Sequence, residues 1–130
     1  MSDDATTQRG PSAHAPPAMV GALALSSHRD GESHTLCLSG ELDIANVDLV
    51  HDELARIESS GASSIVIDLA GLTFMDSTGI QLLVRAHARS RTDAHRLTLR
   101  PGPAAVQRVF TLCGVDELLP FGDPTDPSPG

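Results

Sequence analysis

Aromatic side chains are almost missing from this chain. In 130 residues there is no Trp or Tyr and only 3 Phe. The core must therefore be aliphatic, built from Leu, Val, Ile and Ala, which fill a protein interior well. The length suits one domain with a modest core. The shortage of aromatics also removes the platforms on which single-stranded nucleic acids stack.

Basic residues are few as well. Lys and Arg together number 9 against 17 Asp and Glu, which gives a formal net charge of −8 with His neutral. Nucleic-acid binding depends on Lys and Arg meeting phosphates, so no direct nucleic-acid partner is expected. A basic protein partner is favoured instead, because complementary charge speeds the encounter of two proteins.

Cysteines and long apolar runs are also scarce. Cys37 and Cys113 lie far apart and form no CxxC pair, so we interpret both as buried thiols in a reducing cytosol. No segment approaches the about 20 apolar residues that span a bilayer, so no membrane association is expected. The apolar stretch 18–25 follows Asp3 and Asp4 and not a basic n-region. It is therefore interpreted as a strand of a cytoplasmic protein and not as a signal peptide.

Both ends of the chain have the composition of disordered segments. Residues 1–18 are rich in Ser, Thr, Pro, Ala and Asp without periodicity, and residues 122–130 are similar. Such segments cannot bury enough apolar surface to offset their ordering entropy. We predict a single domain over residues 19–121, between a disordered N-terminal extension at 1–18 and a disordered tail at 122–130.

Strand and helix patterns alternate along the predicted domain. Period-2 alternation and β-branched residues predict strands at residues 19–27, 34–39, 64–69 and 95–100. Apolar residues at helical spacing predict helices that begin near residues 44, 77 and 103. The order β-β-α-β-α-β-α predicts an α/β domain, with helices packed against a mixed sheet of four to five strands.

Gly40-Glu41-Leu42-Asp43 is expected to end the second strand. Apolar residues then recur at helical spacing from Ile44 to Ile57 and are expected to share one buried face. Asp43 or Asn46 is suited to cap this helix. On its own, the tetrapeptide is interpreted equally well as a turn and cap or as part of a binding site.

Asp76-Ser77-Thr78-Gly79 stands where a loop enters the second predicted helix. Asp, Ser and Thr are good N-caps and Gly permits close packing, so these residues also have a purely structural explanation. The tetrapeptide has one residue more than the Asp-[Ser/Thr]-Gly of aspartic proteases, and the chain has no Gly-x-Ser-x-Gly elbow or phosphate-binding loop. The 6 His residues show no metal-ligand spacing. No catalytic residue, metal or cofactor is expected, and the protein is not expected to be an enzyme.

The wider sequence resembles the STAS family of anti-sigma-factor antagonists. The resemblance is carried by residues 40–43, 65–69, 72–80 and 109–115, and covers nearly the whole predicted domain. In that family the first Ser of Asp-Ser-[Ser/Thr]-Gly is phosphorylated, which implies Ser77 here. The family also places the loop that contains Asp43 beside this serine. The resemblance therefore implies a partner-binding set of Asp43, Asp76, Ser77, Thr78 and Gly79.

The resemblance implies a bacterial partner-switching cycle of the kind used in stress responses. The unphosphorylated antagonist binds an anti-sigma factor with serine kinase activity, and a sigma factor is freed for transcription. The kinase phosphorylates Ser77, the antagonist dissociates, and a serine phosphatase restores it. A phosphate adds about −1.5 to −2 charge and is tolerated at a helix N-terminus. Beside Asp76 in an interface, it would repel an acidic partner group and be costly to desolvate.

Two alternatives remain open. A STAS regulatory module of a stress-signalling complex or of a transporter would use the same fold with another partner. A nucleotide-binding or nucleotide-hydrolysing domain belongs to a different class, and titration with nucleotide would detect it.

Overall fold

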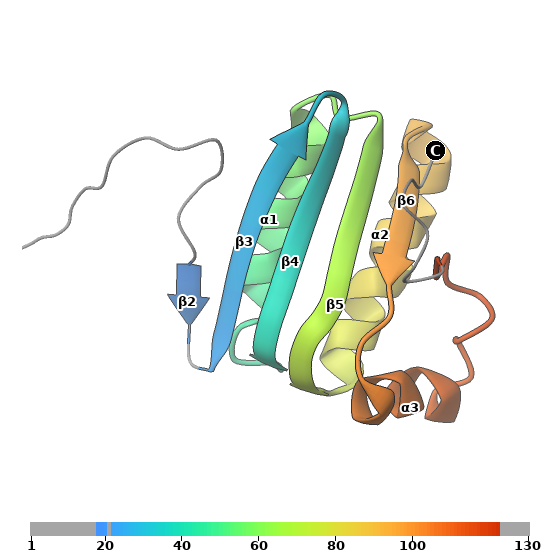
Figure 1. Cartoon of the computed structure of the whole chain (residues 1–130). Coiled ribbons are helices and arrows are strands. Elements are labelled where there is room, and N and C mark those ends of the chain that lie inside the picture. Colours follow the sequence, from blue (N-terminus) through green and yellow to red (C-terminus); the bar gives the residue numbers. More distant parts are fainter. Residues whose placement is uncertain (1–17, 21, 123–130) are drawn as a thin grey trace, which may run out of the picture.

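A five-stranded mixed sheet organises the chain, in the strand order β2-β3-β4-β5-β6. The computed structural model describes residues 18–20 and 22–122 (Figure 1). Except for Ala18 and Gly122, the predicted disordered extension and tail lie outside the described residues. The strands are β2 (Ala18–Val20), β3 (Leu23–Asp30), β4 (Ser33–Leu42), β5 (Ser64–Met75) and β6 (Arg96–Arg100). The helices are α1 (Val47–Ser59), α2 (Ser77–Asp93) and α3 (Ala104–Leu112).

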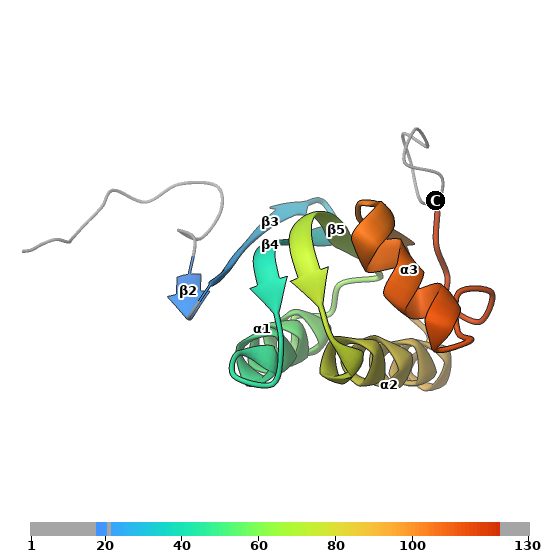
Figure 2. The same cartoon turned by 90° about the horizontal axis from the view of Figure 1, so that it is seen from below.

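The sheet is antiparallel on one side and parallel on the other. β2, β3 and β4 pair antiparallel, whereas β4, β5 and β6 pair parallel through the crossover helices α1 and α2. Figure 2 shows α1 and α2 side by side on one face of the sheet. α3 lies near the carboxyl ends of β5 and β6 (Figures 1 and 2). The predicted α/β class with a mixed sheet is confirmed.

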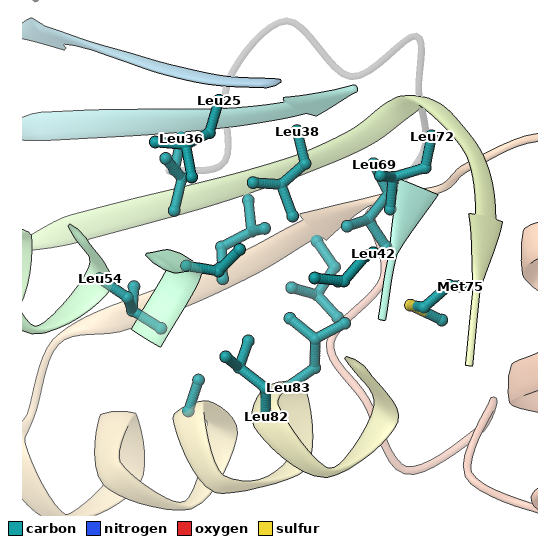
Figure 3. Packing of buried hydrophobic residues seen from close by; sticks show 14 of the residues in the cluster. Leu25, Leu36, Leu38, Leu42, Leu54, Leu69, Leu72, Met75, Leu82 and Leu83 are labelled. Carbon is teal, nitrogen blue, oxygen red and sulfur yellow. The ribbon is translucent and has the colours of Figure 1, made fainter. Parts of the chain in front are cut away.

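The core fills the space between the sheet and the two crossover helices. Leucines of β4 and β5 meet Leu54 of α1 and Leu83 of α2, all of them fully buried (Figure 3). Phe110 is the only aromatic residue among the buried hydrophobics of the described residues. The predicted aliphatic core is therefore confirmed. The core extends to the ends of β4 and β5, where it includes Leu42, Leu72 and Met75.

Several local predictions were wrong. The predicted strand 19–27 is two antiparallel strands, with Ala18 opposite Leu25, because period-2 alternation is the same in one long strand and in a hairpin. Ile44 is not on the buried face of α1, because the helix begins only at Val47. Cys113 is exposed, since it follows the last turn of α3, and Cys37 is only half-buried.

Gly40 was expected to break the second strand, but β4 continues through it to Leu42. Gly40 has a φ of +94°, and the β4–β5 register shifts next to it, as in a β-bulge. A Cβ at this position would lie 1.9 Å from the carbonyl oxygen of Ala22, so only glycine allows this approach. Through this bulge β4 continues alongside β5 as far as Leu42, which lies opposite Met75.

Candidate functional site

β4 and β5 end side by side, and each is followed by a crossover helix. Leu42 lies opposite Met75 in the parallel register. The backbone N–H of Asp76 then donates a hydrogen bond of 3.2 Å to the carbonyl oxygen of Leu42. This contact joins the two loops, so the predicted site residues Asp43 and Asp76 come from neighbouring strand ends. We call residues 41–48 and 74–81 the β4–β5 edge; Figure 2 is seen from its side.

Asp76 fixes the start of α2. Its backbone is extended, and its carboxylate accepts a hydrogen bond of 2.9 Å from the backbone N–H of Thr78. The same carboxylate oxygen accepts a hydrogen bond from the Thr78 hydroxyl. This is the N-cap arrangement expected for Asp before a helix. Asp76 therefore acts as the N-cap that the tetrapeptide predicts. Its second hydrogen bond also engages the hydroxyl of Thr78.

Ser77 and Thr78 differ in the state of their hydroxyls. Thr78 is half-buried and its hydroxyl is engaged with Asp76. Ser77 is exposed, and its hydroxyl has no hydrogen-bond partner among the described residues. At the first position of α2, the Ser77 hydroxyl is therefore the more accessible of the two.

Gly79 contributes to the site through packing. It is buried, and a Cβ here would lie 2.6 Å from Cγ of Met75 and 3.0 Å from Cδ2 of Leu42. These distances are shorter than normal carbon contacts, so a larger residue here would force the Met75 and Leu42 side chains or the start of α2 to shift. Gly79 thereby sets the position of Ser77 and offers no side chain to a partner.

The turn between β4 and α1 is held rigidly by Asn46. Its amide oxygen accepts from the backbone N–H of Asp43 at 2.9 Å, and its amide nitrogen donates to the carbonyl of Glu41 at 2.9 Å. The Asp43 carboxylate accepts from the backbone N–H of Ala45 at 3.0 Å. Asn46 is only 2% exposed and holds the N-cap position of α1, but its side chain bonds backward to the turn instead of capping the helix.

The β4–β5 edge is acidic and carries two exposed apolar side chains. Its sequence contains four carboxylates, on Glu41, Asp43, Asp48 and Asp76, and no Lys, Arg or His. Ile44 is 76% exposed and Phe74 is 48% exposed. Sequence reasoning missed both apolar residues, because Ile44 fits the helical period of α1 and Phe74 lies between the predicted strand 64–69 and the second predicted helix. Their positions in the sequence could have indicated them, since Ile44 follows Asp43 and Phe74 lies two residues before Asp76.

A groove runs from this edge between the two crossover helices. It has a volume of about 180 Å³ and is lined by Val47, Asp48, His51, Thr78, Gln81, Leu82, Arg85 and Arg89. Small-molecule sites usually enclose about 300–1,000 Å³, so the groove does not favour a nucleotide. In the part of the chain that the structure describes, no group of His, Cys, Asp and Glu is placed to hold a metal ion, and no helix is long and apolar enough to cross a membrane.

Known proteins share this fold and sequence pattern. The family described as "Mlab, STAS domain" matches residues 25–120. An anti-sigma-B factor antagonist of Staphylococcus epidermidis is 25% identical over 89 residues, which cover 68% of this chain and 82% of the relative. An anti-sigma factor antagonist from Mycobacterium paratuberculosis has a TM-score of 0.72 at 18% identity, covering 80% of this chain and 88% of that chain. The anti-sigma factor antagonist SpoIIAA, solved in its unphosphorylated form, has a TM-score of 0.63 at 25% identity, covering 85% and 88%.

Proposed function

Because the chain belongs to the STAS-domain family, we propose that it is an anti-sigma-factor antagonist that is inactivated by phosphorylation of Ser77. The observation that carries this proposal is the free, exposed hydroxyl of Ser77 on the β4–β5 edge, beside a threonine whose hydroxyl is engaged. The similarity to antagonists of anti-sigma factors supports the same function. In its unphosphorylated form the protein binds the anti-sigma factor and frees the sigma factor.

A phosphate on Ser77 leaves the fold intact and changes the surface. The side chain stands at the N-terminus of α2, where the backbone N–H groups and the helix dipole favour negative charge. The added charge of about −1.5 to −2 falls on an edge that already holds four carboxylates. A partner that covers this edge must strip water from the phosphate, so binding weakens without a large change of shape.

The partners follow from this role. The anti-sigma factor is itself the serine kinase that modifies Ser77, and a serine phosphatase returns the antagonist to its binding form. Asp43, Asp76, Ser77 and Thr78 lie on the contact surface, and Gly79 supports it from beneath. The protein acts in the cytoplasm as a regulator and not as an enzyme.

Phosphate transfer tests the assignment of Ser77. Incubation with the cognate kinase and ATP should add one phosphate, located on Ser77 by mass spectrometry. Ser77→Ala should abolish the incorporation, because the remaining hydroxyl of Thr78 is held by Asp76. Thr78→Ala serves as the matched control and should still accept one phosphate. Labelling of the Ser77→Ala variant at the wild-type rate would disprove the assignment.

A second candidate is a STAS regulatory module with another partner, in a stress-signalling complex or a transporter. It is favoured by the description of the matched family, which names the domain and no sigma-factor partner. A pull-down with Ser77→Ala as bait separates the two candidates. Recovery of a serine kinase with its sigma factor supports the antagonist, whereas recovery of transporter subunits supports the second candidate.

A further inference from the structure

Two of the large apolar side chains that this protein exposes stand together on the β4–β5 edge. Phe74 lies opposite Glu41 near the end of β5, and Ile44 is two residues beyond the end of β4. They are 48% and 76% exposed, although apolar residues elsewhere in the two strands are mostly buried. A single exposed apolar residue needs no explanation. Two of them near the ends of adjacent strands, on the edge that also contains Ser77, require one.

Both side chains are presented by rigid backbone. Ile44 lies in the turn that Asn46 holds with two hydrogen bonds. In β5, Phe74 lies two residues after Leu72 and directly before Met75, both of them buried, and it pairs with Glu41 of β4. Apolar anchors on ordered backbone lose little conformational entropy when a partner covers them. This is the usual character of the few residues that dominate an interface.

The charges around the two residues indicate the chemistry of the occupant. Glu41 and Asp48 are exposed, Asp43 and Asp76 are half-buried, and the edge has no basic side chain. Interfaces typically have an apolar centre and a polar rim, and the potentials of the two partners are complementary. The basic side chains His51, Arg85 and Arg89 line the groove that leads away from this edge. Exposed apolar residues among the carboxylates of the edge itself fit a partner that presents apolar contacts bordered by Lys or Arg.

We propose that Ile44 and Phe74 are the apolar anchors by which the anti-sigma factor is held, with basic partner side chains facing the acidic rim. The inference rests on the proposed function, because it takes the anti-sigma factor as the occupant. It adds two binding residues outside the tetrapeptides 40–43 and 76–79 and states the chemistry of the complementary surface. It also explains how a phosphate acts here, since Ser77 lies on the same edge and its phosphate would have to be desolvated beside these anchors.

Serine substitution of the anchors tests the proposal. Ile44→Ser and Phe74→Ser should each weaken binding of the purified anti-sigma factor at least tenfold in calorimetry, because each removes apolar contact area. Leu112→Ser and Leu118→Ser are matched controls, since these leucines are 78% and 55% exposed but lie at the end of α3 and after it. The controls should bind within twofold of wild type. Melting curves of all four variants should overlay that of wild type.

The rim is tested separately by Glu41→Gln. This change should slow association and reduce its dependence on salt, because it removes one exposed charge that attracts a basic surface. An unchanged salt dependence, or a faster association, would contradict the basic character assigned to the partner.

The outcomes separate this inference from the proposed function. If wild type binds the anti-sigma factor and loses it on phosphorylation, but both anchor variants bind as tightly as wild type, only the inference is wrong. Equal weakening in the Leu112 and Leu118 variants would also overturn it. If wild type binds no anti-sigma factor, both proposals fail. Dimerisation of wild type that is lost in Ile44→Ser would assign the edge to a second copy of this chain and overturn the choice of occupant.

Discussion

Asp76 caps α2 and, in the proposed function, also takes part in the switch. Its carboxylate holds the backbone N–H and the hydroxyl of Thr78, which starts α2 and withdraws one of two adjacent hydroxyls from solvent. The same carboxylate lies one residue before Ser77, so a phosphate there would add charge next to charge. In the proposed cycle, a single carboxylate therefore leaves Ser77 as the accessible hydroxyl and raises the cost of burying its phosphate in an interface.

His34 makes the stability of the fold depend on pH. It is 6% exposed, and its Nδ1 has no hydrogen-bond partner in the part of the chain that the structure describes. Burial, followed by the charges of Arg56 and Arg29, lowers its pKa below 6.5. The other charged groups facing it are Glu53, which opposes this shift, and His28. Between the lowered folded pKa and the unfolded value, the unfolded chain binds more protons, so stability falls as the pH falls through this range.

Denaturation over a pH series measures this effect. The free energy of unfolding should decrease from pH 7 downward through the ordinary His range of about 6.5. A His34→Gln variant should show a flatter profile over the same range. Glu53 acts only at more acidic pH, because its hydrogen bond with Arg56 lowers its pKa below 4.5. A profile of the His34→Gln variant as steep as that of wild type would exclude His34 as the cause.

The position of Ser77 depends on where β5 ends and where α2 begins. α2 can start directly under the end of β5 because Gly79 leaves room for Met75 and Leu42. The start of α2 and the ends of α1 and α3 were predictable from sequence, since Asp76 is an N-cap residue and Gly61 and Gly114 follow α1 and α3 with positive φ. The start of α1 was not, because Ile44 fits the helical period but lies before the first residue of the helix. The ends of the strands were not predictable from sequence. Glycine normally weakens a strand, but a bulge at Gly40 allows β4 to stay paired with β5 beyond it.

Gly79→Ala should displace the start of α2. Its Cβ would overlap Met75, and overpacking of this kind costs about 1–3 kcal/mol. Phosphorylation of Ser77 and binding of the anti-sigma factor should both weaken. Gly114→Ala is the control, since Gly114 has a φ of +75° and no atom near its Cβ position. It should lower stability but leave phosphorylation and binding unchanged. Equal effects of the two variants on binding would show that lost stability, and not the position of α2, is responsible.

At the scale of the whole molecule, one acidic edge combines the motifs and the apolar anchors. The motif residues of this edge were predictable, because they are polar, lie in loops and match a family pattern. Ile44 and Phe74 were not, because their exposure depends on where α1 begins and on which way β5 turns its last residues. A phosphate on Ser77 was expected to weaken binding by repelling an acidic partner group and by the cost of its desolvation. Because the proposed partner is apolar and basic at this edge, the cost of desolvation is the favoured cause.

The affinity of the anti-sigma factor for unphosphorylated and phosphorylated protein tests the central claim most directly. Calorimetry should show binding about a hundredfold weaker after phosphorylation of Ser77, a difference of about 2.8 kcal/mol. Circular dichroism should be the same for the two forms, because the phosphate is accommodated at the start of α2. Equal affinity of the two forms would contradict the account, and weak binding accompanied by lost helix signal would replace a surface switch with unfolding of α2.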